Sequence, residues 1–194
     1  MKNPVQKDYN IILGSGSPRR KELLADLGVE FTVRLVKGVE EVYPDTLPVD
    51  EIPEYLSKLK ANAYTSLIGD KDLVITADTI VIAEGKPMGK PKGHDDAVNM
   101  LKILSGSVHK VITGVTLQSK EKSVSFSVLT LVEFAELDDE EIEYYVDKYK
   151  PFDKAGAYGI QEWIGCMGVK KIEGSFYNVM GLPLHRLYTE LKKF

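Results

Sequence analysis

The type of fold is indicated first by the stretch Tyr9–Gly28, YNIILGSGSPRRKELLADLG. Its first five residues form a short apolar run, typical of a buried strand, and a Gly-Ser-Gly turn follows. Ser17 suits the N-cap of a helix, and Pro18 suits its first position, where the missing N–H costs nothing. An apolar face on that helix is expected at Leu23, Leu24 and Leu27. Gly28 is expected to end the helix, so the stretch predicts a strand–turn–helix unit.

Strand and helix patterns alternate along the rest of the chain. Strands are expected at Phe31–Val36 and Leu73–Ala77, with Ile80–Ala83 continuing the second one to a turn at Glu84–Pro87. Helices are expected at Val49–Ser66, Asp95–Leu104, Asp138–Lys148 and from Pro183 onward. The runs Val108–Gln118 and Ser123–Phe134 flank a polar turn and predict an antiparallel β-hairpin. Parallel strand–helix units beside a hairpin predict an α/β fold with a mixed β-sheet flanked by helices and a β-hairpin extension.

The composition indicates which class of protein this is and which partners it excludes. Hydrophobic residues make up 43% of the 194 residues and charged residues 28%, as in a globular protein. The net charge of −4 argues against a nucleic-acid partner, because phosphate neutralisation needs a basic excess. The single cysteine, Cys166, fits a reducing compartment. Since the first ten residues lack an apolar signal core and no run suits a membrane helix, we expect a cytoplasmic protein without a membrane partner.

The loop Gly14–Arg20, GSGSPRR, is the first candidate for chemistry. Backbone N–H groups at a helix N-terminus bind anions, and glycines let an anion approach closely. Arg19 and Arg20 stand in the first helical turn, where the helix dipole repels cations, and a bound phosphate would resolve that conflict. A capped surface helix with two solvated arginines explains the same residues. The established phosphate motifs G-x-x-x-x-G-K-[ST] and G-x-G-x-x-G do not match here.

Asp78-Thr79 follows the apolar strand LVITA. A carboxylate at the carboxyl end of a strand lies where open α/β sheets place their ligands. There it can bind a divalent metal or accept a proton from water. An ordinary aspartate in a turn is the alternative, although the second apolar run leaves this one inside a largely apolar stretch, where an unpaired charge is costly.

Two further segments carry weaker signals. Gly89–Gly93, GKPKG, is a basic loop that can contact a phosphate or simply be a solvated turn. Tyr149–Gln161, YKPFDKAGAYGIQ, is rich in glycine and aromatic residues. It can hold a planar base through ring contacts and the Gln161 amide, or it can be a structural Ω-type loop.

Taken together, the motifs resemble those of the Maf family of nucleotide pyrophosphatases. SGSPRR, Lys60-Ala61, Ala77-Asp78-Thr79, GKP, KAGAYGIQ and GLPL occur in this order between Ile11 and Leu191. The resemblance implies one Maf-like domain over residues 1–194 with a Maf/ITPase-like fold and an active site in a cleft. It implies cleavage between the α and β phosphates of a nucleoside triphosphate, a divalent cation such as Mg²⁺ or Mn²⁺, and a homodimer. Two departures, Gly14 where alanine is common and Lys92-Gly93 after GKP where an acid often appears, touch no assigned residue.

The same resemblance implies a role for individual residues. Asp78 would be the proton acceptor that activates water, and Glu41 and Asp78 would hold the metal. The triphosphate would be handled by Ser15, Arg19, Arg20, Lys60 and Lys90. The residues that resemble the branch acting on dTTP and UTP are Arg19, Thr79 and Gln161. Thymine and uracil share an O4, N3–H and O2 edge that an amide can recognise in complementary fashion.

Two other functions remain open at this point. One is a house-cleaning triphosphatase for damaged purine nucleotides, and modified pyrimidine nucleotides are also possible substrates of the implied activity. The other is a nucleotide-sensing or cell-division protein without turnover. Asp78 favours catalysis, since a triphosphate-binding protein gains nothing from an added negative charge unless that charge holds a metal.

Overall fold

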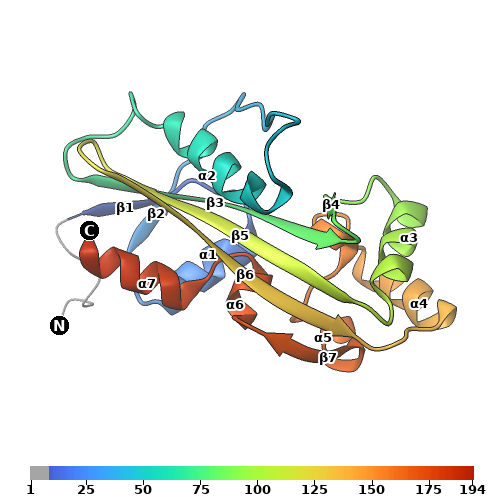
Figure 1. Cartoon of the computed structure of the whole chain (residues 1–194). Coiled ribbons are helices and arrows are strands. Elements are labelled where there is room, and N and C mark those ends of the chain that lie inside the picture. Colours follow the sequence, from blue (N-terminus) through green and yellow to red (C-terminus); the bar gives the residue numbers. More distant parts are fainter. Residues whose placement is uncertain (1–8) are drawn as a thin grey trace. The chain divides into compact units, whose positions relative to one another are not determined.

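The computed structural model describes residues 9–194; the start of the chain, where we expect no signal core, lies partly outside them. The described strands form one mixed sheet in the order β2-β1-β3-β5-β6-β7, and β4 pairs with β3 (Figure 1). The strands are β1 (Asn10–Leu13), β2 (Phe31–Val33), β3 (Asp72–Ala83), β4 (Lys86–Met88), β5 (Val108–Gln118), β6 (Ser123–Phe134) and β7 (Val169–Glu173). The helices are α1 (Pro18–Asp26), α2 (Ile52–Asn62), α3 (His94–Leu104), α4 (Asp139–Tyr149), α5 (Trp163–Gly168), α6 (Phe176–Met180) and α7 (Leu184–Lys193), with 3-10 turns η1 (Val49–Glu51) and η2 (Ala155–Ala157). The predicted mixed sheet with flanking helices is confirmed.

The chain divides into two compact units. The first contains the described residues up to Asp78, together with Thr113–Val128 and Gly181–Phe194. The second contains Thr79–Ile112 and Leu129–Met180. The long strands β3, β5 and β6 contribute residues to both units. A single domain over residues 1–194 stays a prediction.

The first unit contains the predicted strand–turn–helix. β1 runs parallel to both β2 and β3. The Ser17 hydroxyl accepts a hydrogen bond from the Arg20 N–H, Pro18 opens α1, and Gly28 follows its end with φ +67°. In Figure 1, α1 and α7 lie on one face of the strands of this unit and α2 lies on the other. The caps expected from the sequence are confirmed.

Close packing fixes the position of α2. A Cβ at Gly114 of β5 would stand 2.2 Å from the Pro53 backbone, so only glycine lets the start of α2 approach the strand this closely. One turn further on, the Ser57 hydroxyl contacts the Thr116 hydroxyl at 2.8 Å, and the Thr76 hydroxyl donates to the Ser57 carbonyl at 2.7 Å. These contacts determine where the last turn of α2, with Lys60, lies.

Three expected boundaries were wrong. The helix expected at Val49–Ser66 starts as the 3-10 turn η1, and α2 ends at Asn62 because the chain then forms i→i+3 turns, with the Thr65 hydroxyl donating to the Asn62 carbonyl. β2 ends at Val33 rather than at Val36. The expected turn at Glu84–Pro87 is shorter, since Glu84 and Gly85 have positive φ and β4 begins at Lys86.

The second unit has its own apolar core. Leu101 and Leu104 of α3, Phe134 of β6, and Ile142 and Tyr145 of α4 are almost fully buried in it. α3 and α4 lie side by side (Figure 1), and the His94 imidazole approaches Glu143 and Asp147 across them. A capping box in which Asp138 and Glu141 exchange hydrogen bonds starts α4. The sequence did not predict β4, α5, β7 or α6, which lie outside its clear periodic segments.

Candidate active site

The loop between β1 and α1 lies against β3. The Gly14 N–H donates to the Ile75 carbonyl at 2.8 Å. A Cβ at Gly14 would stand 2.9 Å from both the Thr76 methyl and the Tyr64 hydroxyl. Glycine at this position lets the backbone approach that closely. The loop therefore places Ser15 at the carboxyl end of β1.

Ser15 organises the first turn of α1. The residue is buried, and its hydroxyl oxygen accepts hydrogen bonds from the Ser17 N–H at 3.3 Å and from Arg20 Nη1 at 3.4 Å. Both bonds lie within the GSGSPRR segment, so Ser15 fixes the guanidinium of Arg20 relative to the loop. A contact between Ser15 and a phosphate stays a prediction.

Arg20 joins three segments of the first unit. Its Nε donates to the Gly181 carbonyl and its Nη1 to the Ala77 carbonyl, each at 2.8 Å. Burial lowers the pKa of Arg20, Asp78 and Glu41 act to raise it, and Arg19 lowers it further. An arginine remains charged under these conditions. Arg20 is thus a fixed cation, and its bond to Gly181 explains why the distant GLPL motif belongs with SGSPRR.

Lys60 joins the two candidate carboxylates. Its Nζ lies 2.6 Å from Asp78 Oδ1 and 2.9 Å from Glu41 Oε2. Lys60 stands in the last turn of α2, where the helix dipole favours a cation. Asp78 lies on β3, and Glu41 lies in the irregular segment between β2 and η1. Residues far apart in sequence therefore form one charged cluster, which we call the Lys60 cluster: Glu41, Lys60 and Asp78.

The sequence pattern placed Asp78 at the carboxyl end of a strand, but in the structure Asp78 lies within one. β3 continues from Asp72 through Asp78 to Ala83. The pairing of β1 with β3 runs only from Asn10–Asp72 to Leu13–Ile75, so β1 ends three residues before Asp78. The carboxylate therefore lies just beyond the carboxyl end of the neighbouring strand, β1. That is still the edge at which open α/β sheets bind ligands.

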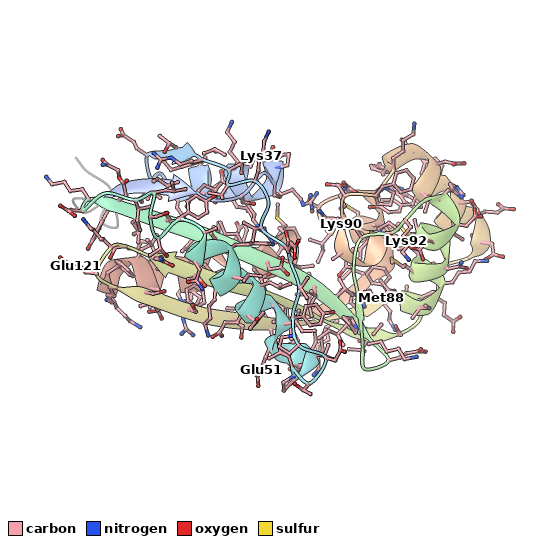
Figure 2. All side chains as sticks on the ribbon, turned by 90° about the horizontal axis from the view of Figure 1, so that it is seen from above. Lys37, Glu51, Met88, Lys90, Lys92 and Glu121 are labelled. Carbon is pink, nitrogen blue, oxygen red and sulfur yellow. The ribbon has the colours of Figure 1, made fainter. Side chains whose placement is uncertain are left out.

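The remaining candidate residues belong to the second unit. Thr79 follows Asp78 on β3 and is half-buried. Lys90 is exposed on the loop between β4 and α3, where Figure 2 labels it with Lys92. Gln161 is exposed on a turn that precedes α5. Within this unit the Gly156 N–H donates to the Gly89 carbonyl at 3.1 Å, so the KAGAYGIQ loop contacts the GKP loop next to Lys90.

A buried network lies beside Gln161 that no sequence pattern indicated. Lys154 Nζ lies 3.0 Å from Glu162 Oε1, and the Tyr145 hydroxyl donates to Glu162 Oε2. The Gly159 N–H donates to the Tyr145 oxygen at 3.0 Å. Lys154 belongs to the KAGAYGIQ motif, whereas Tyr145, which binds the other oxygen of the same Glu162 carboxylate, lies on α4. No spacing within the sequence connects the two.

The described residues contain no group of three or more histidine, cysteine or carboxylate side chains able to hold a metal. Glu41 and Asp78 supply two carboxylates, and both contact Lys60. Mg²⁺ is typically bound by one or two carboxylates together with substrate phosphates and waters. The donor set therefore fits a metal that arrives with a nucleotide, and does not fit an ion caged by protein alone.

The fold and the cluster together define a class: an α/β protein with arginine, lysine and carboxylate side chains at the carboxyl end of a sheet strand, an arrangement suited to phosphate chemistry. The sequence pattern of the family described as Maf-like protein matches residues 10–194. The chain belongs to the Maf family.

Curated relatives match almost the whole chain. A dTTP/UTP pyrophosphatase of Phocaeicola vulgatus is 59% identical over 95% of this chain and 96% of the relative. Proteins of the same name from Bacteroides thetaiotaomicron and Parabacteroides distasonis are 58% and 55% identical, over 95% and 97% of this chain and 96% and 97% of theirs. Among solved structures, a nucleoside-triphosphatase / dITP/XTP pyrophosphatase from Mycobacterium abscessus is similar with a TM-score of 0.41 and 11% identity, over 66% of this chain and 75% of that one. The described residues include no helix long and apolar enough to cross a bilayer.

Proposed function

We propose that this chain is a nucleoside triphosphate pyrophosphatase that hydrolyses dTTP and UTP to the monophosphate and pyrophosphate. The observation that carries the proposal is the Asp78 carboxylate, paired with Lys60 at 2.6 Å and placed near the fixed cation Arg20. The names of relatives that are 55–59% identical over nearly the whole chain support the choice of substrate.

In this proposal Asp78 accepts a proton from a water molecule. The oxygen of that water bonds to one phosphorus of the α–β bridge, and the bond from this phosphorus to the bridging oxygen breaks, so that the products are the nucleoside monophosphate and pyrophosphate. Catalysis of phosphoryl transfer consists mainly of positioning and of charge stabilisation on the phosphoryl oxygens. Arg19, Arg20 and Lys60 supply the positive charge, and Ser15 holds the Arg20 guanidinium in place.

A divalent cation, Mg²⁺ or Mn²⁺, is part of the proposal. Glu41 and Asp78 would hold it together with the phosphates of the substrate. When bound, such an ion neutralises charge on phosphoryl oxygens and orients the reacting groups. Lys60 supplies charge compensation to the same two carboxylates in this structure.

The residues of the second unit are assigned by family resemblance. We propose that Lys90 contacts the triphosphate and that Gln161, with Arg19 and Thr79, selects the pyrimidine. The exposed amide of Gln161 offers one donor group and one acceptor, which complement N3–H and O4 of thymine or uracil.

The composition of the chain supports a proposal for its cellular setting. The single cysteine supports a reducing compartment, and we place the enzyme in the cytoplasm in a house-cleaning role. The acidic net charge supports a small anionic substrate in place of nucleic acid. The Maf resemblance supports a homodimer.

A substrate panel tests the proposal. Purified chain with Mg²⁺ or Mn²⁺ is assayed for pyrophosphate release from dTTP, UTP, dCTP, GTP, dITP and a methylated GTP, with no partner protein present. We expect the highest kcat/KM for dTTP and UTP and a monophosphate product. Highest activity on dITP or methylated GTP would contradict the substrate assignment, and nucleotide binding without pyrophosphate release would indicate a sensing protein.

A further inference from the structure

The turn that presents Gln161 is closed by its own end residues. The Glu162 N–H donates to the Gly159 carbonyl at 3.0 Å. A Cβ at Gly159 would stand 2.7 Å from the carboxyl carbon of Glu162, so glycine lets the Glu162 side chain fold back over the turn. Ile160 is buried and anchors the turn, while Gln161 is exposed at its tip. The orientation of the Gln161 amide therefore depends on where Gly159 and Glu162 are held.

Both ends of the turn are held by one buried network. The Tyr145 oxygen accepts from the Gly159 N–H and its hydroxyl donates to Glu162 Oε2. Lys154 Nζ pairs with the other carboxylate oxygen, Oε1, at 3.0 Å, and with Asp153 Oδ1 at 2.9 Å. The Tyr145 side chain is fully buried and Lys154 is 8% exposed, so breaking either contact would leave a buried polar group without its partner.

The same segment also contacts the GKP loop. The Ala157 N–H donates to the Lys154 carbonyl at 3.1 Å, and the Gly156 N–H donates to the Gly89 carbonyl at 3.1 Å. Gly156 has φ +68°, and a Cβ there would stand 2.9 Å from a Val81 methyl. One hydrogen-bonded segment thus contacts the turn of Gln161 at one end and the backbone next to Lys90 at the other.

We propose that Tyr145, Lys154 and Glu162 are positioning residues for recognition of the base by Gln161. This inference rests on the proposed function. Misplacing a contacting group by about 1 Å can cost about a hundredfold in rate, even when the mutation is distant from the chemistry. Loss of the network leaves Gln161 in the chain but lets its amide turn away, so pyrimidine selectivity falls. A purely structural role would instead lower activity on all nucleotides equally.

The test compares kcat/KM for dTTP with that for dCTP, because cytosine reverses the donor and acceptor pattern at positions 3 and 4. Tyr145→Phe and Glu162→Gln remove the network with little change in volume, and Gln161→Ala removes the amide that contacts the base. Tyr144→Phe is the matched control, because it removes a hydroxyl from the neighbouring tyrosine of α4. Tyr144 is 43% exposed, and its hydroxyl accepts a hydrogen bond from the surface residue Lys148. Lys154→Arg tests whether a different cation at this position can keep the ion pair with Glu162.

We expect the ratio of kcat/KM for dTTP to kcat/KM for dCTP to fall about tenfold or more in Tyr145→Phe and Glu162→Gln. In the control Tyr144→Phe the ratio should stay within about twofold of the wild-type value. It should be higher in Lys154→Arg, which keeps the cation, than in Lys154→Met, which removes it. In the double variant Tyr145→Phe/Gln161→Ala the ratio should equal that of Gln161→Ala alone. A ratio that falls in Gln161→Ala but not in the network variants overturns this inference and leaves the proposed function intact. An unchanged ratio in Gln161→Ala overturns the role of Gln161 and this inference with it, and a wild-type chain without selectivity overturns the proposed substrate as well.

Discussion

Replacing Lys60 with methionine removes an ammonium group and keeps a side chain of similar length. In the folded protein Lys60 Nζ lies 2.6 Å from Asp78 and 2.9 Å from Glu41, and the exposed fractions of the side chains are 17%, 13% and 53% respectively. Two unit charges about 4 Å apart attract each other by about 4 kcal/mol at an effective dielectric constant of about 20. Removing one partner of a buried pair costs about 3–5 kcal/mol, since the other charge is left unpaired.

The cost here should be smaller than in a fully buried pair. Asp78 keeps some access to water, and the pair with the more exposed Glu41 contributes about 0–1 kcal/mol. We therefore expect Lys60→Met to lower the free energy of unfolding by about 2–3 kcal/mol. Loss of one cation from the phosphate site should also lower kcat/KM for dTTP by about 10²–10³-fold.

The measurements are urea unfolding and pyrophosphate release on the same preparations. Lys60→Arg, which keeps the charge, and Glu41→Gln, which breaks only the exposed pair, are the matched controls and should each lose less than about 1 kcal/mol of stability. Wild-type stability together with wild-type kcat/KM in Lys60→Met would show that Lys60 neither stabilises the cluster nor contacts the substrate.

Two further predictions come from other parts of the molecule. Arg20→Lys replaces the two donor atoms that bind the Gly181 and Ala77 carbonyls, Nε and Nη1, with a single nitrogen. We expect it to lower the unfolding free energy by about 1–3 kcal/mol and kcat/KM by at least about tenfold. Values equal to those of the wild type in urea unfolding and pyrophosphate release would contradict this role of the guanidinium. Burial lowers the pKa of His109 to about 4, from about 6.5 in the unfolded chain, so the unfolded state binds more protons between these values and stability falls as the pH decreases. The contribution of His109 to this loss is about 2 kcal/mol between pH 7.5 and pH 5, and His109→Asn should remove it; an unchanged pH dependence in urea unfolding of that variant would show that His109 does not titrate in this way.

Local signals in the sequence were sufficient for part of the fold. The Ser17 cap, the proline after it and the terminal glycine predicted α1, and two long runs that flank a polar turn predicted β5 and β6 with the bounds that the structure has. The strand through Asp78 was interrupted in the prediction, because a polar Asp-Thr pair is unusual inside an apolar strand. Its continuity depends on pairing with β5, a strand distant in the sequence, and that pairing leaves no local pattern.

In the candidate site, too, local motifs were predictable from the sequence and contacts between distant residues were not. The residues of SGSPRR and Asp78 were predicted from loop chemistry and family resemblance, and the structure brings Arg20, Lys60, Glu41 and Asp78 together in the first unit. The bond from Arg20 to the Gly181 carbonyl spans 161 positions and has a backbone partner, so no residue type could have indicated it. Tyr145 was likewise missed, since a tyrosine on the inner face of a helix is indistinguishable in sequence from an ordinary core residue.

The most direct test of the account is the hydrolysis of dTTP by Asp78→Asn. Asparagine has the same shape as aspartate but cannot accept the proton of the attacking water, and it also changes the charge beside Lys60. We predict that turnover falls by about 10²–10⁴-fold while the circular dichroism spectrum stays that of a folded chain. Near-normal pyrophosphate release by the folded variant would contradict the proposal that Asp78 activates water.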